Sequence, residues 1–189
     1  MSRLSSDDWL ALVEIARRAI SSAILEKRVP DFPPHPAALS ERRGAFVSLY
    51  RGGTLRGCVG QVESPGPLAE VVAISAINAA MYDSRFPPIR PEEIAALQIE
   101  ISVLTPPERI LPEAIVAGRH GLMVVRGSFR GLLLPQVATE RNWSGQRLLE
   151  ETCVKAGLPR DAWSEPATQV FGFTAEIFSE KGAGATSEP

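Results

Sequence analysis

Apolar residues between positions 6 and 27 recur every three to four residues, with charged residues on the opposite side. This spacing predicts an amphipathic helix that begins near Ser5 or Ser6, because a serine hydroxyl suits the N-cap position. The segment 30–36 then contains four prolines. Because proline has no backbone N–H to donate, we expect this segment to be an extended loop.

Two pairs of alternating segments predict β-hairpins. In the first pair, strands over 45–50 and 54–62 flank Arg51-Gly52-Gly53, a tight turn in which glycine tolerates a positive φ. In the second pair, strands over 121–125 and 129–134 flank a similar Arg-Gly-Ser turn. The two hairpins share a weak sequence echo, which either duplication or common hairpin chemistry explains.

The other apolar segments predict further helices and strands. Residues 68–82 are apolar almost all round, which predicts a buried helix. Residues 143–156 predict another helix, closed by Gly157. We also expect a short helix over 91–96, strands over 98–104 and 168–178, an irregular segment over 106–117 and a disordered tail over 181–189.

These elements predict an α+β fold in which antiparallel β-hairpins pack with three to four helices. The chain does not alternate strand and helix regularly, so a Rossmann-type sheet is not expected. A length of 189 residues fits one domain, which we expect to cover residues 1–180.

The composition excludes several classes of protein. Hydrophobic residues make up 44% and charged residues 22%, as in globular domains, and the net charge is −2. The sequence contains no run of basic residues, so it does not indicate a nucleic-acid partner. The apolar stretch 71–82 is too short to span a membrane, and the charged N-terminal pattern lacks a signal-peptide core. We therefore expect a cytoplasmic protein in which Cys58 and Cys153 are free thiols.

The segment Leu55-Arg-Gly-Cys-Val-Gly60 carries the most promising chemistry. In a strand, Arg56, Cys58 and Gly60 share one face, while the opposite face belongs in the core. We expect Gly60 to leave a space beside the thiol, which a ligand or another backbone segment could fill.

Arg56 is close enough along the strand to reach the sulfur of Cys58. A neighbouring cation favours the thiolate, which is the nucleophilic form of cysteine. Cys58 is equally well explained as a small hydrophobic residue in a tight hairpin, because the second hairpin has Leu132 at the comparable position. The residues alone leave a reactive and a structural Cys58 open.

Two further segments contain candidate site residues. His120 lies between glycines in a turn, where it could act as a base beside Cys58 or make one structural hydrogen bond. Asp83, Arg85 and Phe86 precede a Pro-Pro pair that limits the freedom of their loop. These side chains could orient a site or form a structural salt bridge.

Familiar catalytic signatures are missing. The sequence contains no phosphate-binding glycine loop, no dinucleotide fingerprint, no nucleophile elbow and no zinc-protease helix motif. The two histidines and two cysteines show no spacing typical of metal ligands, so we expect neither a metal nor a cofactor.

Five motifs occur in an order that resembles a known family, the AMMECR-type domain, called AmmeMemoRadiSam system protein A in prokaryotes. The resemblance covers about residues 10–180. The motifs are Leu55-Arg-Gly-Cys-Val-Gly60, Asp83-Ser-Arg-Phe-Pro-Pro88, Gly118-Arg-His-Gly-Leu122, Leu134-Pro-Gln-Val137 and Lys155-Ala-Gly-Leu-Pro159.

This resemblance implies an α+β fold with a larger and a smaller lobe, and a Leu-Arg-Gly-Cys strand near the cleft between them. It also implies two partners, a Memo-like protein related to metal-dependent dioxygenases and a radical S-adenosylmethionine enzyme. Val59 stands where the family commonly has isoleucine. The signature positions of the family fall on Arg56, Gly57, Cys58, Gly60, Asp83, Arg85 and Phe86.

Two functions follow as hypotheses. In the first, Cys58 is a nucleophile or covalent carrier, Arg56 activates it or binds an anionic substrate group, and His120 or Asp83 moves protons. In the second, the protein is a non-catalytic module that binds a small molecule or a partner protein, with Arg56 and Arg85 as anion anchors. The sequence leaves substrate and oligomeric state open, and a nucleic-acid function has little physical support.

Overall fold

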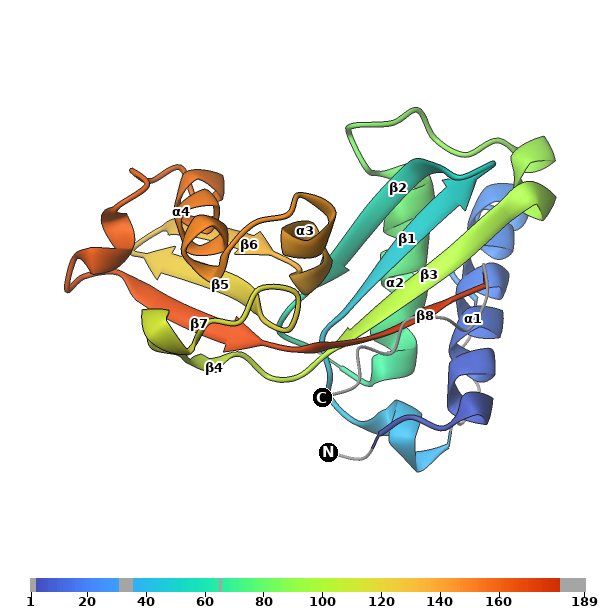
Figure 1. Cartoon of the computed structure of the whole chain (residues 1–189). Helices are drawn as coiled ribbons and strands as arrows, with labels where there is room; N and C mark the ends of the chain where they lie inside the picture. The colour runs from blue at the N-terminus through green and yellow to red at the C-terminus, as the bar shows by residue number, and fades with distance from the viewer. Residues whose placement is uncertain (1–2, 31–35, 65, 181–189) are drawn as a thin grey trace. The chain divides into compact units, whose positions relative to one another are not determined.

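The computed structural model describes residues 3–30, 36–64 and 66–180 in two compact units. Unit 1 comprises the chain up to Val103 together with the segment that begins at Glu176, and unit 2 runs from Leu104 to Ala175 (Figure 1). Most of the predicted proline-rich loop and all of the predicted tail lie outside the described residues.

Unit 1 is built on a four-stranded antiparallel sheet with the strand order β2-β1-β3-β8. The strands are β1 (Ala45–Arg51), β2 (Thr54–Gln61), β3 (Leu97–Leu104) and β8 (Ala175–Ser179). Strand β2 therefore lies at one edge of the sheet, and its outer side is not paired with another strand of that sheet. The turn between β1 and β2 has positive φ values at both glycines, as expected for a tight hairpin.

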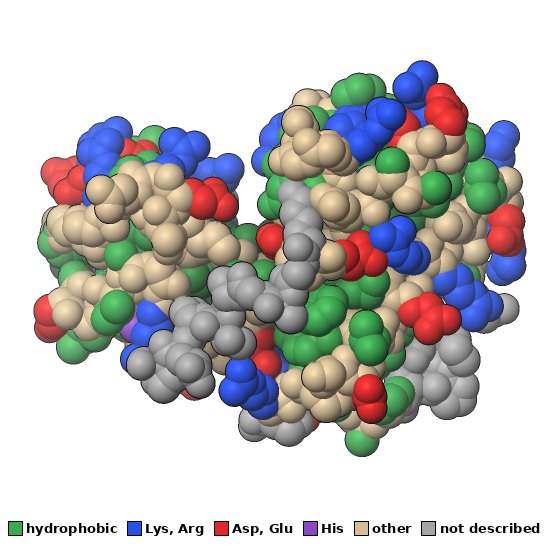
Figure 2. Space-filling model, turned by 45° about the vertical axis from the view of Figure 1, so that its right-hand side comes forward, with side chains coloured by type: hydrophobic (Ala, Val, Ile, Leu, Met, Phe, Trp, Pro, Cys, Tyr) green, Lys and Arg blue, Asp and Glu red, His purple; other side chains and the backbone are tan. Residues whose placement is uncertain are grey.

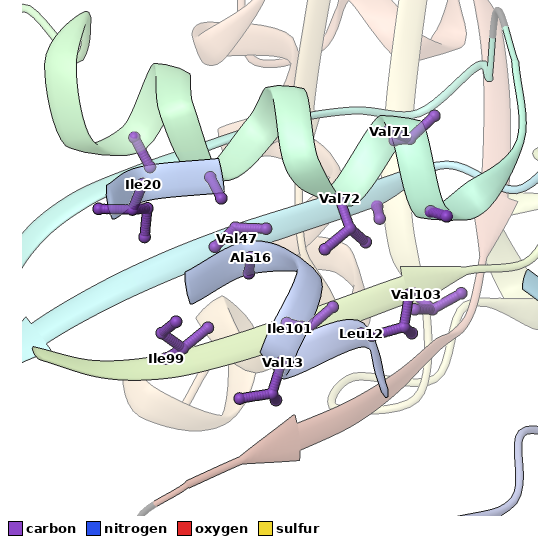
Figure 3. Packing of buried hydrophobic residues seen from close by; sticks show 14 of the residues in the cluster. Leu12, Val13, Ala16, Ile20, Val47, Val71, Val72, Ile99, Ile101 and Val103 are labelled. Atoms are coloured by element: carbon purple, nitrogen blue, oxygen red, sulfur yellow. The ribbon is translucent and has the colours of Figure 1, made fainter. Parts of the chain in front are cut away.

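Two helices form the apolar layer of unit 1. Helix α1 (Ser6–Ser21) begins with a capping box between Ser5 and Asp8, and helix α2 (Leu68–Met81) is buried along almost its whole length. Their apolar side chains pack against the strands (Figure 3). The core residues drawn there with labels are Leu12, Val13, Ala16, Ile20, Val47, Val71, Val72, Ile99, Ile101 and Val103.

Unit 2 contains a second four-stranded antiparallel sheet and its own core. Its strand order is β4-β7-β5-β6, and its core includes Leu122, Val124 and Leu148. The strands are β4 (Glu108–Arg109), β5 (Gly121–Arg126), β6 (Phe129–Leu133) and β7 (Gln169–Phe173), and the α-helices are α3 (Pro135–Glu140) and α4 (Gly145–Lys155).

Short helical segments connect these elements. A π-helical turn, η1 (Ser22–Glu26), extends α1 up to Lys27, whose left-handed conformation ends the helix. The 3₁₀ helices are η2 (Ala37–Ser40), η3 (Pro91–Ala96), η4 (Pro112–Ala114) and η5 (Ala162–Ser164).

The structure confirms the α+β class and the antiparallel hairpins and corrects three details. The segment 168–178, predicted as one strand, forms two strands in different sheets, and at the junction between them the Thr174 amide donates to the Thr105 hydroxyl. The sequence analysis missed helix α3, which has only six residues. It also missed the two-residue strand β4.

The echo between the two hairpins has a packing counterpart. A Cβ at Gly57 in β2 would lie 2.0 Å from the carbonyl oxygen of Ala79 in α2. A Cβ at Gly131 in β6 would lie 2.3 Å from the backbone nitrogen of Ala156, directly after α4. Each hairpin therefore uses a glycine to let a helix approach its strand closely.

Candidate functional site

The backbone of Cys58 is bound on the free side of edge strand β2 by two side chains from the loop after α2. Its N–H donates to Asp83 Oδ2 at 2.9 Å, and its carbonyl accepts from Arg85 Nη2 at 3.0 Å. Asp83 and Arg85 thus supply the acceptor and the donor that a neighbouring strand would supply. These two hydrogen bonds join the two sequence motifs, Leu-Arg-Gly-Cys and Asp-Ser-Arg-Phe, to each other.

The loop holds this pair in a fixed geometry. Arg85 Nε and Nη2 donate to the two carboxylate oxygens of Asp83 at 2.9 and 2.7 Å, and the Arg85 amide donates to Asp83 Oδ1. The Phe86 amide donates to the Asp83 carbonyl, and the Phe86 ring lies 5.4 Å from the Arg85 guanidinium carbon. Such bidentate pairing fixes orientation as well as charge.

The electrostatics of the pair are strongly coupled. The hydrogen bonds from the Arg85 side chain hold the pKa of Asp83 well below its usual range, although burial opposes this shift. The Asp83 carboxylate in turn raises the pKa of Arg85. Asp83 is 6% exposed and Arg85 is 56% exposed, so the carboxylate is shielded while the guanidinium remains accessible.

Cys58 is a partly exposed residue, and its sulfur accepts a hydrogen bond from Ser48 Oγ at 3.2 Å. Ser48 is directly opposite Cys58 in the register of β1 and β2. On its other side, Ser48 pairs with Glu100 of β3. A polar row, which we define as Cys58, Ser48 and Glu100, therefore crosses three strands on one face of the sheet.

The two candidate glycines make room for protein atoms. Gly57 faces α2, as the expected alternation requires. The expected space beside Gly60 is filled, because a Cβ there would lie 2.3 Å from the Ala45 carbonyl oxygen and 2.5 Å from a ring carbon of Phe46. Of the two occupants considered for that space, the structure shows a neighbouring backbone segment. A ligand-binding role for either glycine stays a prediction.

The guanidinium of Arg56 is directed to a different partner from the one expected. It donates to both carboxylate oxygens of Glu93 in η3, at 3.3 and 3.5 Å. Arg51 and Arg90 donate to the same carboxylate. The basic side chain that hydrogen-bonds to Cys58 is Arg85, through the backbone carbonyl.

His120 belongs to unit 2, where it lines a pocket of about 460 Å³ together with residues of β4 and of the C-terminal end of β7. Its Nδ1 accepts a hydrogen bond from the Val116 amide at 3.1 Å. Burial, and then the charge of Arg119, lower the pKa of His120 from its ordinary value of 6.5. Because Cys58 belongs to unit 1, the Cys–His pair stays a prediction.

Sequence reasoning missed three polar residues near the candidate motif, namely Ser48, Glu93 and Glu100. For Ser48 a signal exists in the sequence, because Phe46, Ser48 and Tyr50 alternate with the core residues Ala45, Val47 and Leu49; in the structure Ser48 is itself buried. The pairing of Ser48 with Cys58 depends on register, which the sequence does not give. Nothing in the sequence marks Glu93 as the meeting point of three arginines.

Other features bear on the chemistry available. Cys153 in α4 is a fully buried free thiol, and burial raises its pKa. Among the described residues, no group of three or more His, Cys, Asp or Glu side chains could hold a metal ion. None of the helices in the described ranges is long and apolar enough to cross a membrane. Positive and negative side chains are interspersed on the face shown in Figure 2.

Comparison with known proteins places these motifs in a family. A profile of the family described as AMMECR1 matches residues 13–178. The chain belongs to the AMMECR1 family. A relative from Methanothermobacter thermautotrophicus, described only as "Protein", is 46% identical over 189 residues, covering 95% of this chain and 97% of the relative. Protein TK0174 of Thermococcus kodakarensis is 45% identical, covering 93% of this chain and 92% of that protein.

A solved AMMECR1-family structure has the same fold. The crystal structure of the uncharacterised protein PH0010 from Pyrococcus horikoshii matches with a TM-score of 0.86 and 44% identity, covering 90% of each chain. The names of these relatives state no activity, so membership of the AMMECR1 family supports the fold and leaves the reaction to be argued from the site.

Proposed function

We propose that Cys58 is the centre of a reactive thiol site in which it acts as a nucleophile or covalent carrier. The observation that carries this proposal is that Cys58 is a partly exposed residue whose sulfur accepts a hydrogen bond from Ser48. This hydrogen bond holds the sulfur in one position at a partly exposed residue, so that an electrophile can meet it in a fixed orientation. The thiolate is the form that attacks an electrophile.

The rigidity of the backbone at Cys58 supports the same function. Both polar backbone groups of this residue are bound by Asp83 and Arg85, on a strand that is also paired with β1. A reacting group must be held in one geometry by the groups around it. In this proposal Asp83 and Arg85 position Cys58, and the exposed face of Arg85 adds positive charge beside the thiol.

The remaining predicted residues have roles in the proposal that follow from their chemistry. Arg56 binds an anionic group of the substrate, and His120, whose pKa is lowered so that its ring is neutral, is the proposed proton carrier. Phe86 supports the guanidinium of Arg85 from one face. We infer a cytoplasmic setting, because a reactive free thiol requires reducing conditions.

Alkylation tests the proposal. We expect iodoacetamide at neutral pH to add one label per chain in the wild type and in Cys153→Ser, and none in Cys58→Ser. Ser48→Ala should slow the labelling of Cys58 about tenfold, because it removes the donor to sulfur. Ser84→Ala, an exposed serine in the loop next to Asp83, is the matched control and should leave the rate unchanged.

Two outcomes would contradict the reactive site. One is a Cys58 that resists alkylation in the folded protein and reacts only after unfolding. The other is a Ser48→Ala variant that reacts as fast as the wild type. Intact mass measured against time gives both results without knowledge of the substrate.

The exposure of Arg85 favours a second function, a binding module for a partner protein. Its side chain is 56% exposed although its carboxylate partner is shielded, so it can contact an anionic group. The partners implied by the family resemblance are a Memo-like protein and a radical S-adenosylmethionine enzyme. Co-purification that survives Cys58→Ser but is lost in Arg85→Ala would support this function, and capture of neither protein would count against it.

A further inference from the structure

Three guanidinium groups converge on one buried carboxylate in unit 1, where the first hairpin meets η3. Glu93 in η3 is 3% exposed. The distances from its carboxylate oxygens are 3.0 Å to Arg51 Nη1, 3.3 Å to Arg56 Nη2 and 3.4 Å to Arg90 Nε. We call Glu93 with Arg51, Arg56 and Arg90 the arginine cluster.

Each arginine reaches the cluster through a specific local structure. Arg51 is the last residue of β1, and Arg90 caps η3, where its amide also donates to Glu93. Next to Arg56, the register of β1 against β2 slips by one residue, so that Arg56 is the extra residue of a β-bulge. Bulges redirect side chains and are common next to binding and active sites.

The charges of the cluster do not balance. Three cations face Glu93, whose pKa is lowered to about 2, mainly by the hydrogen bond from the Arg90 amide, so the carboxylate is ionised at neutral pH. Glu92 pairs with Arg90 at 3.2 Å but is 62% exposed, so solvent screens it. Three arginines against Glu93 and Glu92 leave one positive charge in excess. Three arginines against Glu93 alone leave two.

Within residues 3–30, 36–64 and 66–180, the cluster also has hydrogen-bond donors that bind no other side chain. A guanidinium carries five N–H groups. Arg56 donates to Glu93 through Nη2, and Arg51 donates through Nη1. The side chains of Arg51 and Arg90 are 48% and 67% exposed, so their other N–H groups can reach a ligand from solvent. Cations held this close repel one another, and a bound anion would offset that repulsion.

We propose that the arginine cluster binds the phosphate group of a small phosphorylated molecule. A phosphate monoester carries a charge of about −1.5 to −2 at neutral pH, which matches the excess of the cluster. Arginine forks bind its oxygens in pairs. A nucleic acid is a poorer match, because phosphate tracking needs an extended basic surface and this chain has a net charge of −2.

This inference extends the proposed function by naming a class of substrate. Arg56 is two residues from Cys58 on β2, so a phosphate held by the cluster places the rest of the molecule near the strand that carries the thiol. Binding of a phosphate by the arginine cluster does not depend on the proposed function. The inference rests on the proposed function only where it identifies the phosphorylated molecule as the substrate of Cys58.

Pyrophosphate is the probe for the test, in calorimetric titration of the full chain at an ionic strength of about 50 mM. We expect saturable binding that Arg51→Gln weakens about fivefold or more, because it removes one charged donor. Arg147→Gln is the matched control and should leave the affinity unchanged. Arg147 is also ion-paired, with Glu150 and Glu151, and its 45% exposure resembles that of Arg51.

Each outcome decides the matter. No binding up to about 10 mM pyrophosphate, or an equal loss of affinity in both arginine variants, would overturn the proposal. Tighter binding of a single-stranded oligonucleotide through Arg51 would also overturn it. Cys58→Ser should retain the wild-type affinity for pyrophosphate. An unreactive Cys58 together with pyrophosphate binding that depends on Arg51 would refute the proposed function but support the phosphate site. A reactive Cys58 without pyrophosphate binding would refute the phosphate site but support the proposed function.

Discussion

The contact between Asp83 and the backbone of Cys58 predicts a large effect of one substitution on stability. Asp83→Ala removes the acceptor of the Cys58 amide and the partner of Arg85. A shielded amide without an acceptor costs about 1–3 kcal/mol. The ion pair adds about 0–1 kcal/mol, because Arg85 is half exposed. We expect the free energy of unfolding of unit 1 to fall by about 1–4 kcal/mol, with a central value of about 2.5 kcal/mol.

Asp83→Asn separates the two contributions. The asparagine oxygen can still accept from Cys58, so this variant loses the charge but keeps the hydrogen bond. We expect it to lose about 1 kcal/mol, less than half of the cost of Asp83→Ala. Ser84→Ala, in the same loop and exposed, should be neutral.

Urea unfolding followed by tryptophan fluorescence measures these differences. The chain has three tryptophans, of which Trp9 lies in unit 1 and Trp143 and Trp163 in unit 2. Replacing the latter two with phenylalanine leaves Trp9, which stacks on Phe178, as a reporter for unit 1 alone. This matters because two units need not unfold in a single transition.

Amide exchange gives an independent readout at the residue itself. Isotopic labelling of cysteine nitrogen yields two backbone signals, one from Cys58 and one from Cys153. Asp83→Ala should accelerate the exchange of the Cys58 amide and leave that of Cys153, in α4 of unit 2, unchanged. Equal stabilities of the alanine and asparagine variants, or an unaltered Cys58 exchange rate, would refute the reasoning.

Three further predictions follow from the packing and the charges. Gly57→Ala should destabilise unit 1 by about 1–3 kcal/mol in urea unfolding, because its Cβ would overlap the Ala79 carbonyl; wild-type stability would contradict the close approach. Because the pKa of Glu93 is depressed, its ionised form stabilises unit 1 above about pH 4.5, by at most about 3 kcal/mol, and this contribution is lost as pH falls towards 2. Acid unfolding of Glu93→Gln and of the wild type measures the contribution as the difference in their stability. A difference that stays constant down to pH 2 would contradict the prediction. The imidazole of His120 should titrate below pH 6.5 in an NMR titration, and closer to it in Arg119→Gln; a midpoint above 6.5 would contradict the effect of burial.

The local elements of this fold follow from the sequence because they depend on local chemistry. The hydroxyl of Ser5 and the spacing of the apolar residues define α1. The paired glycines define the turn between β1 and β2. The segment 168–178 shows the limit of such reasoning, because nothing in its alternation reveals that Thr174 separates strands of two different sheets.

The candidate site could be predicted as a set of motifs but not as a geometry. The sequence marks Cys58, Asp83 and Arg85 as notable, yet the carboxylate and guanidinium meet the Cys58 backbone only because β2 is an edge strand. Likewise, the placement of Arg56 beside Cys58 assumed strict alternation along the strand. A β-bulge at Arg56 breaks that alternation, and the side chain reaches Glu93 instead. Register, edge position and bulges depend on tertiary pairing, which periodicity does not contain.

The most direct test of the thiol site is the rate of Cys58 alkylation at neutral pH, measured in the Cys153→Ser background and compared with the rate for the same thiol in the unfolded chain. We expect the folded protein to react faster than the unfolded chain, and Ser48→Ala to slow the reaction about tenfold by removing the hydrogen bond to the sulfur. A folded protein that reacts more slowly than the unfolded chain, with no effect of Ser48→Ala, would show that Cys58 is a structural cysteine.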